Sequence, residues 1–347
     1  MPVTDEIARL VRASRDRTVA ATDQQIVALT TAWVEAWNAL APEFDAALAA
    51  LLADTDGTIP ASRVAKDRRI TQALARARST LDDLAARTQA TVTADLASAV
   101  LDAVDAHLAS LQAQLPPEAP GVVLGRLDPD ALDAIVARTT GRIEAMTLAL
   151  PAEVAALMRA ELVRGITVGD NPNTVARRIM ARTEGTFNGG LARATRIART
   201  EMLDAHRMAD LRSAQANRNL IAARVWVATL DSRTCGSCLA QHGTEWPVDT
   251  FGPEDHQQGR CVFFDRTKTW AELGFTGIED DDQDLTAERD EWWDNLTPGS
   301  QDAVLGKTRA DLLRDGQITW ADLSTRRENP DWRPSQVLTP IRDLPGQ

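Results

Sequence analysis

Long runs of helical periodicity limit the folds that this chain can adopt. Across residues 4–115, apolar side chains recur every three or four positions and helix breakers are rare, which is the pattern of amphipathic α-helices. Gly57 and Pro60 interrupt this pattern within residues 55–62, so we expect long helices on both sides of that segment. One apolar stripe of the first helix contains Ile26, Leu29, Trp33 and Trp37. Such a stripe is typical of a core or of a seam against a partner helix.

Prolines divide the helical pattern that follows. Residues 116–125 combine prolines with glycines and form the clearest linker in the chain. After it, Asp128 can cap a helix whose first position is Pro129, because proline is favoured where a helix has no N–H to bond. We expect further helices to begin at Pro151 and at Pro172.

Composition and charge exclude several classes of protein. Tyrosine is absent, which favours helices over sheets. The formal net charge is -12, which argues against a chain that coats nucleic acid along its whole length. Arginines cluster within residues 68–78 and 177–199, either as solvated helix faces or as a local contact with DNA. We find no signal-peptide core and no run of about 18 apolar residues. We therefore expect a chain made in the cytoplasm with no membrane segment.

A cluster of cysteines indicates a metal site. Cys235 and Cys238 form a C-x2-C turn, and His256 and Cys261 follow as an H-x4-C pair. Two thiolates from one turn, closed by a nitrogen and a third sulfur, form the tetrahedral ligand set that Zn(II) prefers. Since four protein ligands leave no open position for water, the sequence predicts a structural zinc rather than a catalytic one.

Other interpretations of the same residues remain open. His242 could replace His256 as the nitrogen ligand. The cysteines could instead be unrelated reduced thiols, or form one disulfide and leave one thiol over. A reducing cytoplasm favours the metal over the disulfide.

Glu201 is an acid inside an apolar helix stripe. Within residues 194–209 its neighbours one turn away offer no cation. A carboxylate that faces an apolar contact needs a partner from elsewhere, and we expect a structural ion pair with Arg233 or Arg260. The alternative is that Glu201 lies at a helix edge in water.

Beyond the helices, the period changes to that of extended strands. Residues 223–230 predict a strand with Val225 and Val227 on one face and Trp226 on the other. Residues 244–246 could return beside it. The metal site then belongs to a sheet too small to fold alone, and zinc binding would supply the missing free energy.

The C-terminal part has weaker signals. Residues 279–294 are strongly acidic and predict a loop or a solvated helix. Trp292, Trp293 and Trp320 are expected to anchor a small core or a partner. Residues 328–347 contain four prolines and predict an extended tail that orders only against a partner.

Several sequence words, taken in order, resemble a known family. These are A-R-T-E at 198–201, D-x-R-T-C-x-x-C at 231–238 and H-x-x-x-R-C at 256–261. Their order and spacing resemble the Mu F-like head-morphogenesis family over about residues 165–270. The family more often closes with H-P-x-C-R-C, and Gly259 stands here in place of the first of those cysteines. An L-G-K-x-R word near the C-terminus resembles the tail of related phage proteins.

The resemblance implies a minor head protein of a tailed bacteriophage, a structural and non-enzymatic part of the procapsid and virion near the portal vertex. The implied partners are the portal protein, the major capsid or scaffolding protein and packaged DNA; the implied location is the head interior or the portal vertex. The competing enzyme class is an HNH-like metal-dependent nuclease, suggested by Asp255 and His256 beside the cysteines. No second histidine follows His256, which weighs against it.

Together these features predict a mainly α fold with a small zinc-stabilised β subdomain, in the α+β class. We expect a helical N-terminal region over residues 1–115 and the Mu F-like domain with its zinc knuckle over residues 126–275. Residues 276–347 are expected to hold an acidic segment, short helices and the extended tail.

Overall fold

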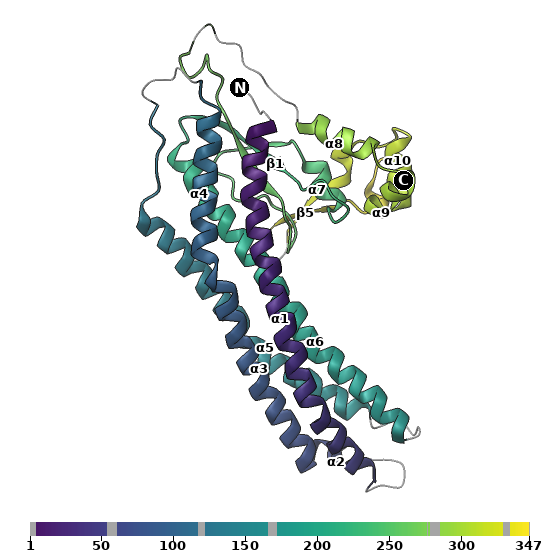
Figure 1. Ribbon diagram of the computed structural model, residues 1–347. Coiled ribbons are helices and arrows are strands. Elements are labelled where there is room, and N and C mark those ends of the chain that lie inside the picture. Colours follow the sequence, from purple (N-terminus) through teal and green to yellow (C-terminus); the bar gives the residue numbers. More distant parts are fainter. Residues whose placement is uncertain are drawn as a thin grey trace. The chain divides into compact units, whose positions relative to one another are not determined.

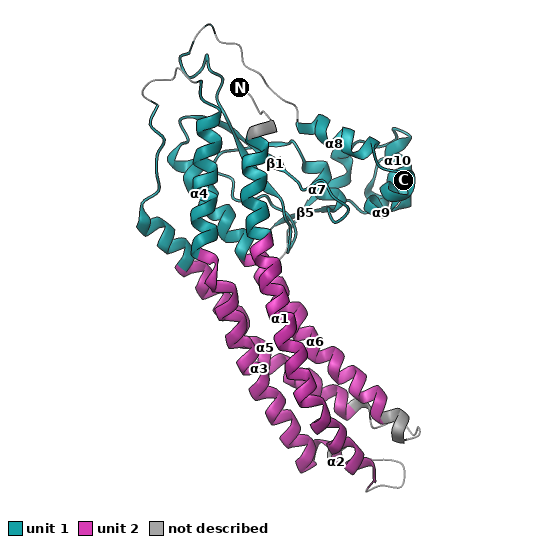
Figure 2. Ribbon diagram, in the orientation of Figure 1, with its two compact units in different colours: residues 1–19, 97–136, 202–347 teal, residues 20–96, 137–201 magenta. Residues whose placement is uncertain are grey.

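The computed structural model divides the chain into two compact units (Figure 1, Figure 2). Unit 1 comprises residues 1–19, 97–136 and 202–347, and unit 2 comprises residues 20–96 and 137–201. This differs from the expected division into 1–115, 126–275 and 276–347, because stretches distant in sequence share each core. The residues that the structure describes are 5–53, 61–116, 122–165, 172–275, 277, 285–328 and 334–346.

Unit 2 is a bundle of helices, coloured magenta in Figure 2. The helices that contribute to it are α1 (Asp5–Ala53), α2 (Ala61–Lys66), α3 (Arg68–Ala94), α5 (Pro129–Gly165) and α6 (Pro172–Ala216). Its core contains fully buried side chains from all five of them, including Trp33, Val64, Leu81, Met158 and Phe187. The indole N–H of Trp33 donates to the carbonyl of Phe187 at 3.3 Å. The apolar stripe of the first helix is therefore a core stripe.

Most of the expected helix boundaries agree with the structure, and one does not. The amide N–H of Asp130 donates to the Asp128 carboxylate at 3.0 Å, so α5 begins with the predicted cap. No new helix begins at Pro151, which lies inside α5. Proline removes one helical hydrogen bond, but Leu150 and Val154 on either side are buried in the unit 2 core, and this packing carries the helix through. Residues 54–60 and 117–121, within the expected interruption and linker, lie outside the described residues.

A three-stranded antiparallel sheet is the centre of unit 1. Its order is β2-β1-β3, with β1 (Ile221–Val227) between β2 (Glu245–Trp246) and β3 (Val262–Thr267). The first two strands confirm the predicted strand and its return, whereas β3 was not expected. One face of the sheet packs Val225 and Phe264 against Ile7 of α1, and the other face packs Trp226 against two of the cysteines.

Helix α4 (Leu96–Ala113) lies mostly in unit 1. Short elements complete the unit, and most of them contribute to a second core: α7 (Gly236–Gln241), α8 (Leu285–Asp294), α9 (Pro298–Leu305), α10 (Lys307–Arg314), β4 (Ser324–Arg327) and β5 (Ser335–Leu338). Trp293 lies in this core, where its ring meets that of Trp320 edge to face at 5.3 Å between centroids. The tryptophans are thus anchors of a small core, and residues 285–294 of the acidic segment form a helix.

The expected extended tail is wrong over residues 334–346. Strand β5 pairs antiparallel with β4, and Leu344 is buried in the same core as Trp293. The prolines suggested an extended chain, but Pro334 and Pro340 flank the strand and leave its backbone N–H groups free to pair. Residues 329–333 lie outside the described part.

The structure confirms a mainly helical chain with small antiparallel sheets. Among the described residues, none of the helices combines the length and the apolar character that crossing a bilayer requires.

Candidate metal centre

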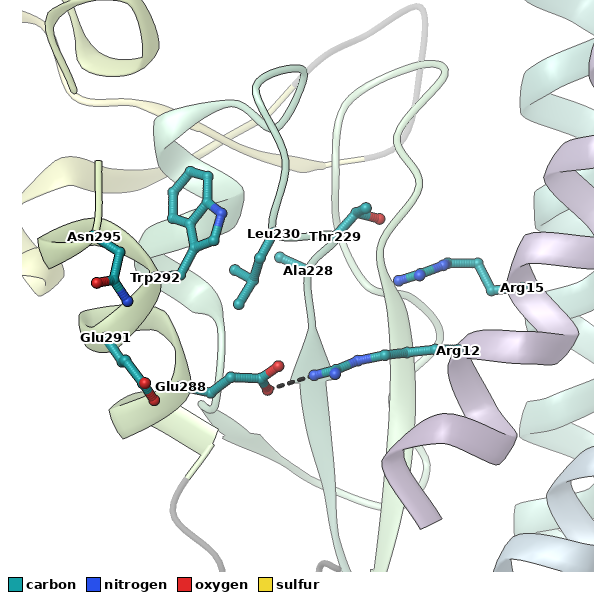
Figure 3. Close-up of a pocket in the computed structure, with 9 residues that line it drawn as sticks. All are labelled: Arg12, Arg15, Ala228, Thr229, Leu230, Glu288, Glu291, Trp292 and Asn295. Carbon is teal, nitrogen blue, oxygen red and sulfur yellow. Dashed lines mark hydrogen bonds and ion pairs between the residues drawn. The ribbon is translucent and has the colours of Figure 1, made fainter. Parts of the chain in front are cut away.

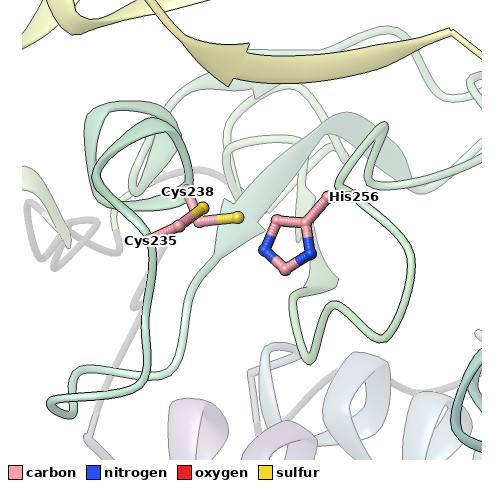
Figure 4. A group of neighbouring side chains, drawn as sticks. All are labelled: Cys235, Cys238 and His256. Carbon is pink, nitrogen blue, oxygen red and sulfur yellow. The ribbon is translucent and has the colours of Figure 1, made fainter. Parts of the chain in front are cut away.

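Three of the four predicted ligands come together in the structure. The ligand atoms of Cys235, Cys238 and His256 all lie within 4.8 Å of one another (Figure 4). Cys235 precedes α7 and Cys238 lies in its first turn, so the C-x2-C word places both sulfurs at one end of a short helix. His256 arrives from the segment that leads into β3.

Cys261 lies beside this group but is not part of it. Its side chain is 2% exposed and packs with Cys238 under Trp226. The thiols of Cys235 and Cys261 both lie in hydrogen-bonding contact with Cys238, which raises the pKa of the Cys238 thiol together with its burial. All three cysteines are described, and none forms a disulfide. Cys261 therefore lies next to Cys238, outside the group of three.

Cys235 and His256 each shift the pKa of the other toward its charged form. Hydrogen bonds from Cys238, and next from His256, lower the pKa of Cys235 to about 3. The Cys235 thiolate in turn raises the pKa of His256 to about 9. A thiolate is the form of cysteine that binds metals, and a metal would displace the imidazole proton.

The second nitrogen of His256 fixes the direction of the ring. Nδ1 of His256 donates to the carbonyl of Gln257 at 2.8 Å. A hydrogen bond of this kind holds metal-binding histidines in one tautomer, and here it leaves Nε2 for a metal. The donor set of two sulfurs and one nitrogen, with a third sulfur adjacent, fits Zn(II).

His242, the alternative ligand, is engaged elsewhere. Its Nδ1 accepts a hydrogen bond from the N–H of Ala228 at 3.1 Å, and its Nε2 faces Glu288 at 3.6 Å. The side chain is fully buried. These contacts favour His256 as the nitrogen ligand.

Arg207, which the sequence did not single out, holds the ligand-bearing segment. From α6, its Nη2 donates to the carboxylate of Asp255 at 2.6 Å and to the carbonyl of Gly259 at 2.9 Å. Both Nε and Nη2 donate to the carbonyl of Cys261, at 3.0 and 2.6 Å. The guanidinium thus fixes the segment on both sides of His256. The only signal for it in the sequence is a cation between apolar positions of the helix.

Gly259 leaves room for this arrangement. A Cβ atom at this position would overlap the carboxylate of Asp255, which is the group that binds Arg207. The departure from the family's closing motif therefore has a structural reason, because a cysteine at 259 would displace Asp255.

Glu201 pairs with a different arginine from the two that the sequence predicted. Glu201 is 1% exposed and accepts a hydrogen bond from Arg142 of α5 at 3.0 Å, within unit 2. Arg233 and Arg260 both pair with Asp231 in unit 1, and the two nitrogens of Arg260 bind its carboxylate at 2.7 Å each. These bonds hold the pKa of Asp231 well below its usual range. Tertiary packing decided which cation each acid meets.

A second group with metal-ligand chemistry already contains its own cation. His107, Asp210 and Asp265 have ligand atoms within 4.8 Å of one another. The buried guanidinium of Arg224 binds Asp210 and, at 2.8 Å, Asp265, and His107 contacts Asp265 at 2.8 Å. Burial raises the pKa of Asp210 to about 6 even though Arg224 opposes the shift. The group is a buried polar network that joins α4, α6 and the sheet.

Comparison with known proteins gives one family match. Residues 157–264 match the family model described as Phage Mu protein F like protein. The match includes all four predicted metal ligands, and it confirms the resemblance indicated by the order of the motifs. No curated protein and no solved structure matches the chain.

Proposed function

We propose, on the premise that residues 157–264 carry a Phage Mu protein F like domain, that this chain is a phage head morphogenesis protein. More specifically, we infer a minor head protein that is a structural component of the procapsid and virion near the portal vertex. The observation that carries the proposal is the family match itself, which spans the cysteine and histidine cluster. Its proposed partners are the portal protein and, secondarily, the major capsid or scaffolding protein.

We further propose that Cys235, Cys238, His256 and Cys261 hold a structural Zn(II). The ligand atoms of three of them lie within 4.8 Å of one another, and their thiolate and imidazole groups suit zinc. The sheet beside the site has only three strands, one of them the two-residue β2, so the metal would contribute free energy that the small sheet lacks. The predicted role is to hold the segment after β2 against α7.

Contact with packaged DNA would involve arginines, some of which already have acidic partners. Arginines of unit 2 that could face phosphates are paired with carboxylates: Arg76 with Glu43, and Arg193 with Glu153. Pairs of this kind on exposed surfaces are weak and can be exchanged for phosphate. A DNA contact would therefore be electrostatic, and sensitive to salt.

The alternative function, an HNH-like nuclease, would need a carboxylate free to bind a hydrolytic metal. Asp255 is fully buried on Arg207, and Glu254 accepts two hydrogen bonds from Arg326. These contacts favour the structural proposal over the enzymatic one.

Co-purification and a cleavage assay test the proposal together. We expect the portal protein encoded nearby to co-purify with the full chain, and plasmid DNA to stay intact with Mg(II) or Mn(II). Metal-dependent cleavage that is lost in His256→Ala would overturn the structural role. A chain that cleaves nothing and binds neither portal nor capsid protein would also contradict it.

A further inference from the structure

A pocket of about 440 Å³ opens in unit 1, and none of the three cysteines lines it (Figure 3). Three segments line it: the first turns of α1, the residues that follow β1, and α8. The volume lies within the range of small-ligand and side-chain pockets. Residues 228–230 of the lining belong to the Mu F-like match, but none of the four predicted metal ligands lines the pocket.

Two hydrogen-bond donors in this pocket have no partner among the described residues. Arg15 has a side chain only 5% exposed, and its Nε and Nη2 contact Asp16 at 2.9 and 2.8 Å. Its Nη1 has no partner in the described part of the chain, and neither has the hydroxyl of Thr229. Figure 3 shows the Arg15 guanidinium directed toward Thr229. Buried donors without acceptors are costly, so an acceptor that reached both of them would be stabilised.

The remaining lining residues define what kind of acceptor fits. Leu230 and the half-buried Trp292 provide an apolar wall next to the two donors. Glu288 is paired with Arg12, whereas Glu291 at the edge has no ion pair in the described part of the chain. The two acids would repel a polyanion such as a nucleic acid more strongly than a single carboxylate, because the repulsion grows with the number of charges. A single carboxylate next to an apolar group could bind the two donors and pack its apolar group on the wall.

We propose that this pocket binds a segment of a partner protein in which an acidic residue lies beside a bulky apolar one. The carboxylate accepts hydrogen bonds from Nη1 of Arg15 and the hydroxyl of Thr229, and the apolar side chain packs on Trp292. Arginine and tryptophan are the residue types that contribute most at protein interfaces, and charge-assisted bonds give the recognition its direction.

The test follows the indole signal of Trp292 in the full-length protein by NMR, assigned from the Trp292→Phe variant. The probe is the dipeptide N-acetyl-Glu-Leu-amide. We expect a saturable shift of this signal, with binding about tenfold tighter than that of N-acetyl-Gln-Leu-amide, because a charged acceptor is replaced by a neutral one. Acetate alone should bind more weakly, since it cannot contact Trp292.

Matched variants assign the effect to the pocket. Arg15→Gln should weaken dipeptide binding about tenfold, while Arg17→Gln should not change it, because Arg17 is 58% exposed and pairs with Asp102 outside the pocket. Thr229→Val changes a single hydroxyl and decides the question if Arg15→Gln does not fold; it should weaken binding severalfold.

Several outcomes overturn the proposal. One is the absence of a saturable shift with the glutamate dipeptide, and another is equal binding of the glutamine dipeptide. A third is unchanged binding by Thr229→Val and by folded Arg15→Gln. If a short DNA duplex or inorganic phosphate shifts Trp292 and the dipeptide does not, the pocket is a phosphate site instead.

Discussion

Cys238 is the residue on which the proposed metal centre depends most. Its thiol contacts those of both Cys235 and Cys261, and it is 2% exposed. We therefore expect a serine at this position to remove the sulfur that contacts both of the other thiols.

We predict about one zinc per chain in the purified protein, and loss of most of that zinc in Cys238→Ser. The region over residues 225–270 should then become sensitive to protease, because metal binding and local folding are coupled. Metal analysis and limited proteolysis measure both effects. Ser232→Ala, three residues before Cys235 and exposed, is the matched control and should keep its zinc; protease resistance that does not depend on metal would contradict the role of zinc.

A buried histidine makes stability depend on pH. Burial, and next the charge of Arg207, lower the pKa of His206 to about 4. Its Nε2 contacts the hydroxyl of Ser14 at 3.0 Å. Between about pH 4 and 6.5 the unfolded chain therefore binds a proton that the folded chain does not, and stability falls as the pH falls through this window.

We predict that this histidine removes up to about 3 kcal/mol of stability between pH 6.5 and 4. Asp210 acts in the opposite sense over part of this range, because its pKa is raised to about 6. The measurement is therefore a difference: urea unfolding of the native chain and of His206→Gln at each pH. The variant should lose less stability on acidification, and equal losses would show that His206 stays protonated in the folded chain.

Helix α6 acts on the metal centre through one side chain. Arg207 is a positioning residue, since it contacts the carbonyls of Gly259 and Cys261 but none of the ligand atoms. A partner of this kind orients the ligands and tunes affinity.

We predict that Arg207→Lys lowers zinc affinity by about 10- to 100-fold, because lysine cannot supply the divergent donors of a guanidinium. Competition with a chromophoric chelator measures the affinity. Arg212→Lys is the control, on the same helix but exposed, with its Nη1 bonded to Gln215. If both variants bind zinc as the native chain does, the segment that carries His256 orders without Arg207.

At the scale of the whole molecule, the N-terminal helical region and the metal region are not separate modules. Residues 1–19 and 97–136 belong to unit 1. Ile7 packs against the β1–β3 face of the sheet, and His107 of α4 contacts Asp265 of β3. The sheet depends on helices that precede it by more than a hundred residues of sequence.

We predict that a chain lacking residues 1–19 loses protection of the sheet and its metal centre in hydrogen exchange, because the apolar face lined by Val225 and Phe264 loses Ile7. Trp33→Ala provides the comparison. It should destabilise unit 2 by about 3–5 kcal/mol through the cavity that it leaves, while zinc stays bound. Retention of a fully protected sheet after the truncation would show that unit 1 does not need this helix.

Local patterns were sufficient to predict several parts of the molecule. The helical period placed the core stripe with Trp33, and the alternation of Val225, Trp226 and Val227 placed β1 and its two faces. The C-x2-C spacing predicted the turn that presents two sulfurs together. The order of short motifs was enough to indicate the family. Each of these depends on residues close in sequence, where backbone geometry alone fixes which side chains are neighbours.

Tertiary structure decided everything that joins distant segments. It gave Glu201 the cation Arg142 rather than Arg233 or Arg260, placed Arg207 behind the metal ligands, and divided the chain into two units across its helices. Several arginines compete for each acid in a charged chain, and sequence alone does not rank pairs separated by dozens of residues. Only the packing of helices and sheet sets those distances, and electrostatic interactions depend on them steeply.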